Sequence, residues 1–587
     1  MRDFHELAPV RGKTAVDAAV AALFVALALV MTWRAWADPH GTTLGVQARD
    51  QHFGEWMLLH AALALKGFES PWFTRLQNVP DGVNLMANVG MQLPGFILAP
   101  VTLTLGPAIS YLSFITTNLA ASGFAWFLFF SRRLALARGA ALAGGLWCAF
   151  APGMISHSSG HPHITAMFLV PVIAARVLTL GTGTRPLRDG FVLGLMVAAQ
   201  LFIGEEVLFL TAFALAMLAA AWAASDTREA RRRLPAAAAS LAAALIVVLA
   251  IAGYPLWIEF FGPMRHDGHP IPVSGDLATF VARPTFALFG GDRAFDALAQ
   301  NFTEQSAFFG WPVLVAAAAI VVWLRRERAV GLAAIVGLAA AVLSLGPSIR
   351  VEGVAEFPGP FALVAGLPVF RSMVIARLAL VSMVAIGVLI AFAVDRLLRP
   401  ATEGGPAAVS PRPPVLRRLA LALLALAVLP VVPHPLPVRR RAEVPQFISS
   451  GQWRQYVAEG ATLVPVPDDG VTSIRWQTAA NMRFAVPLGY FLGPVSAKNS
   501  RGRWGAIARP MTRLMDAAER GESYELTDAK RRGAMNDVRR WNADAVVLFD
   551  SRHPHLARRV LVSLFGDGQP AGEVEVWDVR RFKAAKQ

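Results

Sequence analysis

Residues 17–36 read DAAVAALFVALALVMTWRAW, a run that is apolar and long enough to cross a lipid bilayer as a helix. The run has no small-residue cleavage pattern and leads into further apolar stretches, so we expect it to be retained as a first span. The other stretches of near-spanning length lie at 110–130, 134–152, 162–181, 188–203, 205–224, 235–260, 311–325, 329–347, 372–397 and 417–434. The sequence therefore predicts an all-α polytopic membrane protein with roughly 11 transmembrane helices.

The composition agrees with this class. Of 587 residues, 55% are hydrophobic and only 16% are charged, yet the formal net charge is +15. Arginine-rich cytoplasmic loops and a basic tail account for such a charge, and no basic-aromatic stripe indicates nucleic acid as a partner. The single cysteine, Cys148, excludes a disulfide framework and a cysteine-based metal site.

The short loops alternate between arginine-rich and arginine-free. Arginines cluster near residues 132–138, 185–188, 228–233, 325–328 and 396–418, whereas 153–163 and 204–206 have neither lysine nor arginine. Basic residues stay on the cytoplasmic side, which predicts a cytoplasmic N-terminus (1–16) in a multi-pass protein of the cytoplasmic membrane. The segments then predicted outside are 38–109, 153–163, 204–206, 263–310, 348–370 and 435–587.

Several segments are not expected to cross. Residues 91–107 contain three prolines, and a full crossing would invert every later loop, so we interpret them as a re-entrant or interfacial helix. Residues 55–66 are interpreted as a second interfacial helix. The Pro/Gly-rich residues 398–416 predict a cytoplasmic linker that ends the transmembrane domain, 17–434. TLVPVP (462–467) and ADAVVLF (543–549) are strand-like, which predicts a small extracytoplasmic α/β domain over 435–587.

The first external loop contains the strongest chemical signal. It reads DPHGTTLGVQARDQHFGEWMLLHAALAL (38–65), and Asp50 comes shortly after the first span. A carboxylate at that depth could deprotonate an acceptor hydroxyl beside a lipid-borne substrate. Asp is equally a common N-cap, so Asp50 could instead open a helix. Position alone leaves the two readings even.

A long first external loop with an acid and interfacial helices, many spans and a C-terminal extracytoplasmic domain together resemble the GT-C glycosyltransferases. These include protein O-mannosyltransferases, aminoarabinose transferases and arabinofuranosyltransferases. The resemblance implies a polyprenyl-phosphate sugar donor, an acidic base in the first loop and inverting displacement at the anomeric carbon. That base would be Asp50. The chain departs from several members in having Gln51, not a second acid, after it.

Other candidate residues share the predicted outer side. The second external loop, GMISHSSGHPHITA (153–166), contains His157, His161 and His163. A His-x-His pair can ligate a metal, but no third ligand is evident nearby. Hydrogen bonding of these histidines to phosphate or sugar is therefore favoured over metal binding and over helix capping. The remaining candidates for donor or acceptor binding are Glu55, Glu205, Glu206 and Glu304.

Two arginines complete the set. Arg371 lies at the outer boundary, and Arg377 lies more than a turn inside the membrane. An arginine at that depth needs an anionic partner, and the resemblance implies a polyprenyl phosphate, while a glutamate from another helix is the structural alternative.

The sequence thus favours a membrane glycosyltransferase that moves a sugar from a polyprenyl-phosphate donor to an extracytoplasmic glycan, lipid or protein. The pattern requires no cofactor, and a divalent cation between Asp50 and the histidines stays open. The alternatives are a transporter or flippase of lipid-linked glycans, which should have deep charges and repeats, and a non-catalytic envelope assembly protein.

Overall fold

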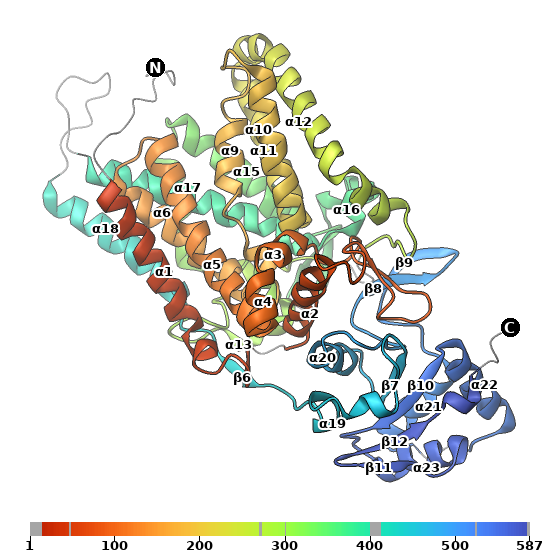
Figure 1. The fold of residues 1–587 in the computed structure, drawn as a ribbon. Coiled ribbons are helices and arrows are strands. Elements are labelled where there is room, and N and C mark those ends of the chain that lie inside the picture. The colour runs from red at the N-terminus through yellow and green to blue at the C-terminus, as the bar shows by residue number, and fades with distance from the viewer. Residues whose placement is uncertain are drawn as a thin grey trace.

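The computed structural model describes residues 14–45, 48–268, 273–299, 301–399, 413–522 and 525–583. The chain is mostly helical. Its long helices gather in one part of the molecule, and the C-terminal strands form a sheet in another, with α2 (Ala48–Ala64) and α20 (Val471–Ala479) between them (Figure 1). The predicted N-terminal segment 1–16 and linker 398–416 lie largely outside the described residues.

Seven helices of the described chain are long and apolar enough to cross a membrane. They are α1 (Thr14–Ala37), α5 (Pro107–Leu128), α10 (Pro186–Ile203), α11 (Glu205–Ser225), α12 (Thr227–Phe261), α17 (Ala379–Leu398) and α18 (Pro414–Val428), the last extended by a 3-10 turn to Val431. Three predicted spans form shorter apolar helices, namely α6 (Arg138–Phe150), α14 (Trp311–Trp323) and α15 (Arg328–Ser344). A multi-pass membrane protein is therefore supported, and the count of 11 stays a prediction.

The stretch 162–181 is not one helix. It divides into α8 (Pro162–Thr165) and α9 (Val170–Val177), which follow α7 (Pro152–His157). Each of these helices has a proline at its first or second position, where the missing N–H costs no hydrogen bond. The prediction of one continuous apolar span over 162–181 is therefore wrong.

Residues 91–107 likewise form two short helices, α3 (Gln92–Ile97) and α4 (Ala99–Leu105). The second ends at Gly106, whose φ of 90° favours glycine, and Pro107 opens α5. Neither short helix reaches the ~20 residues that a crossing needs. This arrangement fits the predicted re-entrant or interfacial segment.

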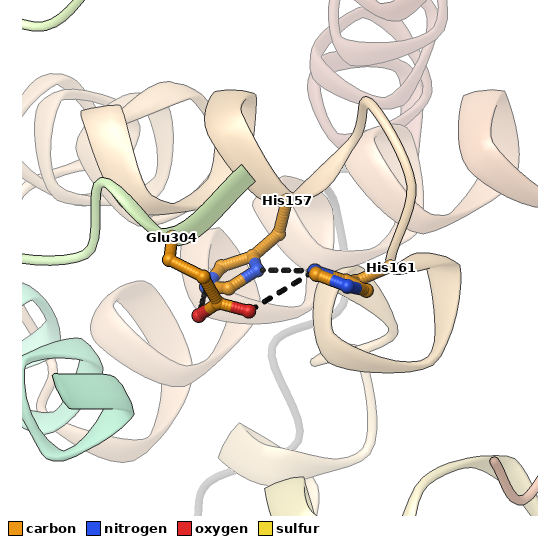
Figure 2. A group of neighbouring side chains, drawn as sticks. All are labelled: His157, His161 and Glu304. Carbon is orange, nitrogen blue, oxygen red and sulfur yellow. Dashed lines mark hydrogen bonds and ion pairs between the residues drawn. The ribbon is translucent and has the colours of Figure 1, made fainter. Parts of the chain in front are cut away.

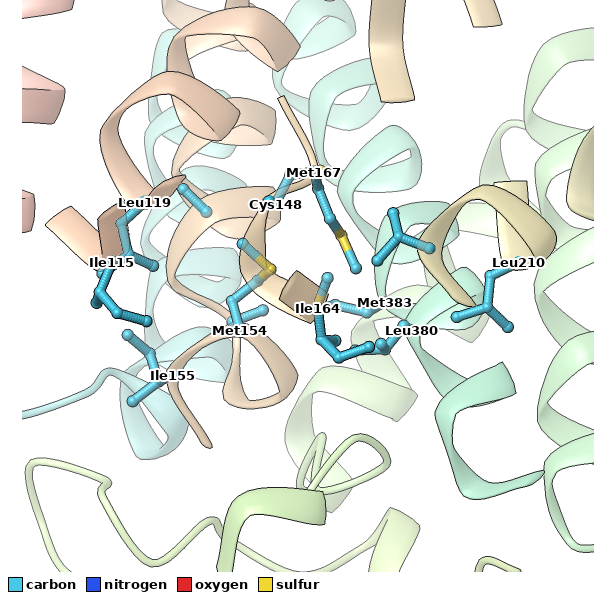
Figure 3. Packing of buried hydrophobic residues seen from close by; sticks show 14 of the residues in the cluster. Ile115, Leu119, Cys148, Met154, Ile155, Ile164, Met167, Leu210, Leu380 and Met383 are labelled. Carbon is cyan, nitrogen blue, oxygen red and sulfur yellow. The ribbon is translucent and has the colours of Figure 1, made fainter. Parts of the chain in front are cut away.

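Glycines bring the helices close together. A Cβ at Gly190 would lie 2.1 Å from the carbonyl oxygen of Ser240, and one at Gly194 would lie 2.7 Å from that of Ala244. The two glycines are four residues apart on α10, the small-xxx-small spacing that lets membrane helices approach. Buried apolar side chains of α5, α6, α7, α8, α11 and α17 fill the central bundle, among them Ile115, Met154, Ile164, Leu210 and Met383 (Figure 3).

Arginine-rich loops that are distant in sequence meet at one end of the bundle. Asp17 on α1 pairs with Arg132 at 2.7 Å and with Arg138 at 3.0 Å. Arg328 donates to Ser225 at 2.6 Å, and Arg399 donates to the carbonyl of Ala135 at 2.9 Å. The loops that the positive-inside rule assigned to one side therefore lie together.

The C-terminal segment forms a four-stranded sheet of order β11-β12-β10-β7. Its strands are β7 (Thr462–Val466), β10 (Ala543–Leu548), β11 (Gln569–Ala571) and β12 (Val574–Asp578). β7 and β10 are parallel and fully buried, as their continuous apolar runs indicated. The helices of this segment are α19 (Gln446–Ser449), α20 (Val471–Ala479), α21 (Pro510–Glu519), α22 (Asp528–Arg540) and α23 (Pro554–Phe565).

Short strand pairs occur elsewhere. They are β2 (Phe73–Thr74) with β3 (Val83–Asn84), β4 (Ser348–Val351) with β5 (Val354–Pro358), and β8 (Leu492–Ser496) with β9 (Asn499–Trp504). A further pair joins distant parts of the chain, because β1 (Thr42–Leu44) lies antiparallel to β6 (Val438–Arg440).

The helix expected at 55–66 begins earlier, as α2 (Ala48–Ala64), and is buried from Gln51 to Ala62. Trp56 on α2 donates to Gln477 on α20 at 2.9 Å. The C-terminal segment thus covers α2, which packs within the protein instead of turning one apolar face to lipid.

Candidate functional site

Asp50 lies in the first turn of α2, where the helix N-terminus favours a carboxylate. The Tyr490 hydroxyl donates to its Oδ1 at 2.6 Å, and Nε2 of His161 lies 3.6 Å from its Oδ2. A Cβ at Gly160 would sit 3.2 Å from the Asp50 Cβ, so the glycine gives the carboxylate room beside this loop. The Asp50 side chain is 16% exposed and remains accessible to a substrate.

Two histidines one helical turn apart face each other behind Asp50. His157 ends α7, and His161 follows in the turn before α8, with their Nδ1 atoms 3.2 Å apart (Figure 2). His157 Nε2 lies 3.0 Å from the Ser306 hydroxyl. His161 thus has Asp50 at one ring nitrogen and His157 at the other.

Glu304 brings the long loop 263–310 to the same place. Its Oε1 lies 3.4 Å from His161 Nδ1, and its Oε2 lies 3.9 Å from His157 Nε2. Arg377 donates to both carboxylate oxygens, from Nε at 3.0 Å and from Nη2 at 2.5 Å. The remaining terminal nitrogen of Arg377 donates to Glu206. A continuous chain of contacts therefore runs from Asp50 to Glu206.

Burial and charge set the protonation states of this group. Burial would raise the pKa of Glu304, but Arg377 and the two histidines hold it down at about 2. Burial lowers the pKa of His157 well below 6.5 and outweighs the Glu304 carboxylate, and it lowers the pKa of His161 in the same way. Near pH 7 Glu304 is ionised and both imidazoles are neutral, so each ring has a lone pair for a hydrogen bond or a metal.

His157, His161 and Glu304 can also hold a metal ion: their ligand atoms all lie within 4.8 Å of one another. In a tetrahedron with bonds of about 2.0–2.1 Å, ligand atoms are ~3.4 Å apart. The measured 3.2 and 3.4 Å around His161 fit this spacing. Asp50 would then orient the His161 ring from its other nitrogen, as carboxylates commonly do behind metal-bound histidines.

Glu55 lies one turn after Asp50 but has a different partner. Arg441 donates to both of its carboxylate oxygens, at 2.5 and 2.7 Å, and Gln51 donates at 2.7 Å. Burial would raise the pKa of Glu55, but Arg441 and His52 bring it to about 2. A substrate-binding role for Glu55 stays a prediction, and this saturated ion pair does not favour it.

Glu205 and Glu206 diverge, although they are adjacent at the start of α11. Glu206 joins Arg377, whereas the Glu205 carboxyl lies within hydrogen-bonding reach of Glu259 on α12. His163 lies beside the group, with its ring centroid 5.7 Å from that of His161 and its Nδ1 buried without a hydrogen-bond partner.

The two arginines also differ. Arg371 is exposed at the end of α16 (Pro368–Ser372), whereas Arg377 is buried in the turn before α17. Arg377 pairs with two glutamates from other elements, which was the predicted alternative to a phosphate partner. Phosphate binding by either arginine remains a prediction, which the exposed Arg371 accommodates more easily.

Three residues of this region escaped the sequence analysis. Tyr490 and Arg441 come from the C-terminal segment, and no local motif marks either as a partner of the first loop. Glu259 had a signal, because it is an acid within the apolar stretch 235–260, where an ionisable residue is costly and often functional.

Neither the known protein-family models nor the curated proteins include a match to this sequence. The fold is similar to those of solved membrane glycosyltransferases, which confirms the predicted resemblance at the level of the fold. The chain is similar to the oligosaccharyltransferase AglB of Archaeoglobus fulgidus, with a TM-score of 0.52 and 11% identity over 92% of this chain and 70% of that one. It is also similar to the arabinofuranosyltransferase AftD from Mycobacteria, with a TM-score of 0.50 and 16% identity over 98% of this chain and 42% of that one. At such identities the likeness establishes a shared fold, and the reaction must be argued from the residues.

Proposed function

We propose that the chain is an inverting glycosyltransferase that transfers a sugar from a polyprenyl-phosphate donor to an extracytoplasmic acceptor. One observation carries the proposal. Asp50 is a partly exposed carboxylate, fixed at one oxygen by Tyr490 and placed beside His161, where the first, second, fourth and sixth external segments of the predicted topology meet. The solved structure of AglB contains a dolichol-phosphate, which is a donor-type lipid in a protein of the same fold.

In the proposed reaction the Asp50 carboxylate accepts the proton of an acceptor hydroxyl. The acceptor oxygen attacks the anomeric carbon from the face opposite the phosphate, and the bond between that carbon and the phosphate oxygen breaks. The polyprenyl phosphate leaves with the bonding electrons, so the configuration inverts. One base in position is sufficient for this displacement.

Charge at the site constrains how the donor phosphate can bind. Arg377 is neutralised by Glu206 and Glu304, and Asp50 adds a further negative charge. An anionic phosphate therefore needs another cation, supplied by the exposed Arg371 or by a divalent ion. A divalent ion held by His157, His161 and Glu304 would offset charge on the leaving phosphate.

The proposal places the chain in the cytoplasmic membrane, with its N-terminus inside and residues 435–587 outside. The gathering of arginine-rich loops at one end of the bundle supports this placement, because Asp50, His161 and Arg377 lie together away from those loops. The acceptor can be a glycan, a lipid or a protein.

Sugar transfer in isolated membranes tests the proposal. A panel of radiolabelled polyprenyl-phosphate sugars is supplied to wild type and Asp50→Asn at matched expression. Transfer by wild type that vanishes in Asp50→Asn while donor binding persists is the expected result. Asp81→Asn is the matched control, because Asp81 is in the same loop but pairs with the exposed Arg540 at 2.8 Å. Equal transfer by wild type and Asp50→Asn would exclude Asp50 as the base, and movement of lipid-linked sugar across the bilayer without transfer would indicate a transporter.

A further inference from the structure

A second polar cluster lies where α3, α10, α11 and α12 meet. Glu205 and Glu259 approach within hydrogen-bonding reach, yet Oε1 of Glu205 and Oε2 of Glu259 are buried without a hydrogen-bond partner. No lysine or arginine of the described chain pairs with either carboxyl. Two buried carboxyls in contact must share a proton or bind a cation.

Gln92 is the independent observation at this cluster. It is 1% exposed, and neither its Oε1 nor its Nε2 has a hydrogen-bond partner. The position that a Cβ on Gly90 would take lies 3.7 Å from Gln92 Oε1 and 3.9 Å from Glu205 Oε1. The amide and the carboxyl therefore border the same space beside Gly90.

The backbone adds a further oxygen. The Leu201 carbonyl lies 3.5 Å from that position beside Gly90, in the last turn of α10, where helix carbonyls have partial negative charge. Asn84 donates to the Ile258 carbonyl at 2.7 Å and so holds the end of α12, with Glu259, against the first external loop.

In apolar surroundings, a buried polar atom without a hydrogen-bond partner raises the free energy of the folded state. Buried apolar residues adjoin the cluster on the same helices, among them Leu201, Phe202 and Ile258. A proton shared by the facing carboxyl oxygens would leave the outer oxygens and the Gln92 amide unsatisfied. A cation would bind the outer carboxyl oxygens and the Gln92 Oε1 together, and an all-oxygen ligand set is typical of Ca²⁺ and Mg²⁺.

We propose that Glu205, Glu259 and Gln92 form a binding site for a hard divalent cation, distinct from the group of His157, His161 and Glu304. The ion would hold α3 and α12 against the start of α11, because its ligands come from all three helices. Because Glu206 is the next residue and pairs with Arg377, the ion would also fix the helix end that presents Glu206 to the candidate active site. This inference does not depend on the glycosyltransferase proposal.

The test is Ca²⁺ binding to the purified full chain in detergent, by isothermal titration and by the thermal unfolding midpoint with and without Ca²⁺. We expect wild type to bind Ca²⁺ and to unfold at a higher temperature with it. Glu205→Gln, Glu259→Gln and Gln92→Leu should each weaken binding about ten-fold or more, because ligand number and charge set the affinity of oxygen sites.

Asp81→Asn is the control, because Asp81 is an exposed acid that pairs with Arg540 and belongs to neither group, so Ca²⁺ affinity should be unchanged. Absence of Ca²⁺ and Mg²⁺ binding to wild type would overturn the proposal. Unchanged affinity in the folded Glu205, Glu259 and Gln92 variants, or an equal loss in Asp81→Asn, would overturn it equally. If Glu205→Gln does not fold, Glu259→Gln and Gln92→Leu decide the question.

Discussion

Removing Arg441 should destabilise the whole chain, because it leaves the buried carboxylate of Glu55 without its main partner. The Glu55 side chain is 3% exposed, and its pKa of about 2 lies well below the ordinary 4.5. At ~1.4 kcal/mol per pKa unit, that shift corresponds to about 3 kcal/mol of stability at neutral pH. Breaking a buried pair typically costs a similar ~3–5 kcal/mol.

The two single variants, Arg441→Met and Glu55→Gln, should not destabilise the chain equally. Arg441→Met leaves a buried acid without its ion-pair partner, whereas Glu55→Gln leaves an arginine that is 16% exposed and can contact water. Arg441→Met should therefore cost about 3 kcal/mol and Glu55→Gln less, and the double variant should cost less than the sum of the two. Since the pKa of Glu55 is lowered, this contribution is constant from pH 8 to about 5 and is lost as the pH falls from 4.5 towards 2.

The assay is equilibrium unfolding by SDS in mixed micelles, followed by tryptophan fluorescence. Arg440 and Glu443 give a matched control, an ion pair of 3.4 Å in which the side chains are 85% and 76% exposed. Arg440→Met should change stability by no more than ~1 kcal/mol. Equal losses for Arg440→Met and Arg441→Met, or strictly additive losses in the Glu55/Arg441 cycle, would refute the reasoning.

Four further outcomes follow from the same contacts. Arg377→Met leaves Glu206 and Glu304 unpaired and should cost about 3–5 kcal/mol, seen as loss of folded protein on size exclusion, while Arg377→Lys should recover part of it. Tyr490→Phe removes the donor to Asp50 and should lower kcat for transfer ~10- to 100-fold at an unchanged unfolding midpoint; an unchanged kcat would deny Tyr490 a positioning role. Chelation should abolish transfer, Mn²⁺ or Mg²⁺ should restore it, and His157→Ala should raise the ion concentration required; transfer that persists in chelator would exclude a metal requirement. Gly190→Leu should destabilise the α10–α12 contact by about 1–3 kcal/mol in SDS unfolding, whereas Gly253→Leu, on a face of α12 with nothing within 4 Å, should not.

Much of the membrane fold could be predicted from hydropathy alone. All but one of the predicted apolar stretches form a helix over most of their length, because a bilayer imposes both the length and the composition of a crossing segment. The exception, 162–181, is also apolar, but it divides into short helices that begin with prolines, and the turn before the first of them brings His161 beside Asp50. Hydropathy predicts an apolar segment and does not fix whether its helix is continuous.

The candidate site was only partly predictable, for a reason of sequence distance. A histidine pair and a first-loop acid are visible locally, and they do lie together. Glu304 as the third possible ligand, and Tyr490 as the partner of Asp50, depend on how distant segments pack, which no local spacing encodes. Arg377 illustrates the same limit. An intramembrane arginine predicts an anionic partner, but the sequence does not show whether that partner is a ligand or a glutamate.

The pairing of β1 with β6 bears on how the chain is made. Arg441 and Glu55 are 386 residues apart in sequence, so the helix that holds Asp50 leaves the ribosome long before the segment that covers it. At ~5–20 residues per second, the interval is roughly 20–80 seconds. During synthesis the loop 38–109 therefore waits for the segment that covers it, and Glu55 has no Arg441 partner until then. A nascent chain arrested before residue 438 would have its predicted spans complete but would lack the partners of both Glu55 and Asp50.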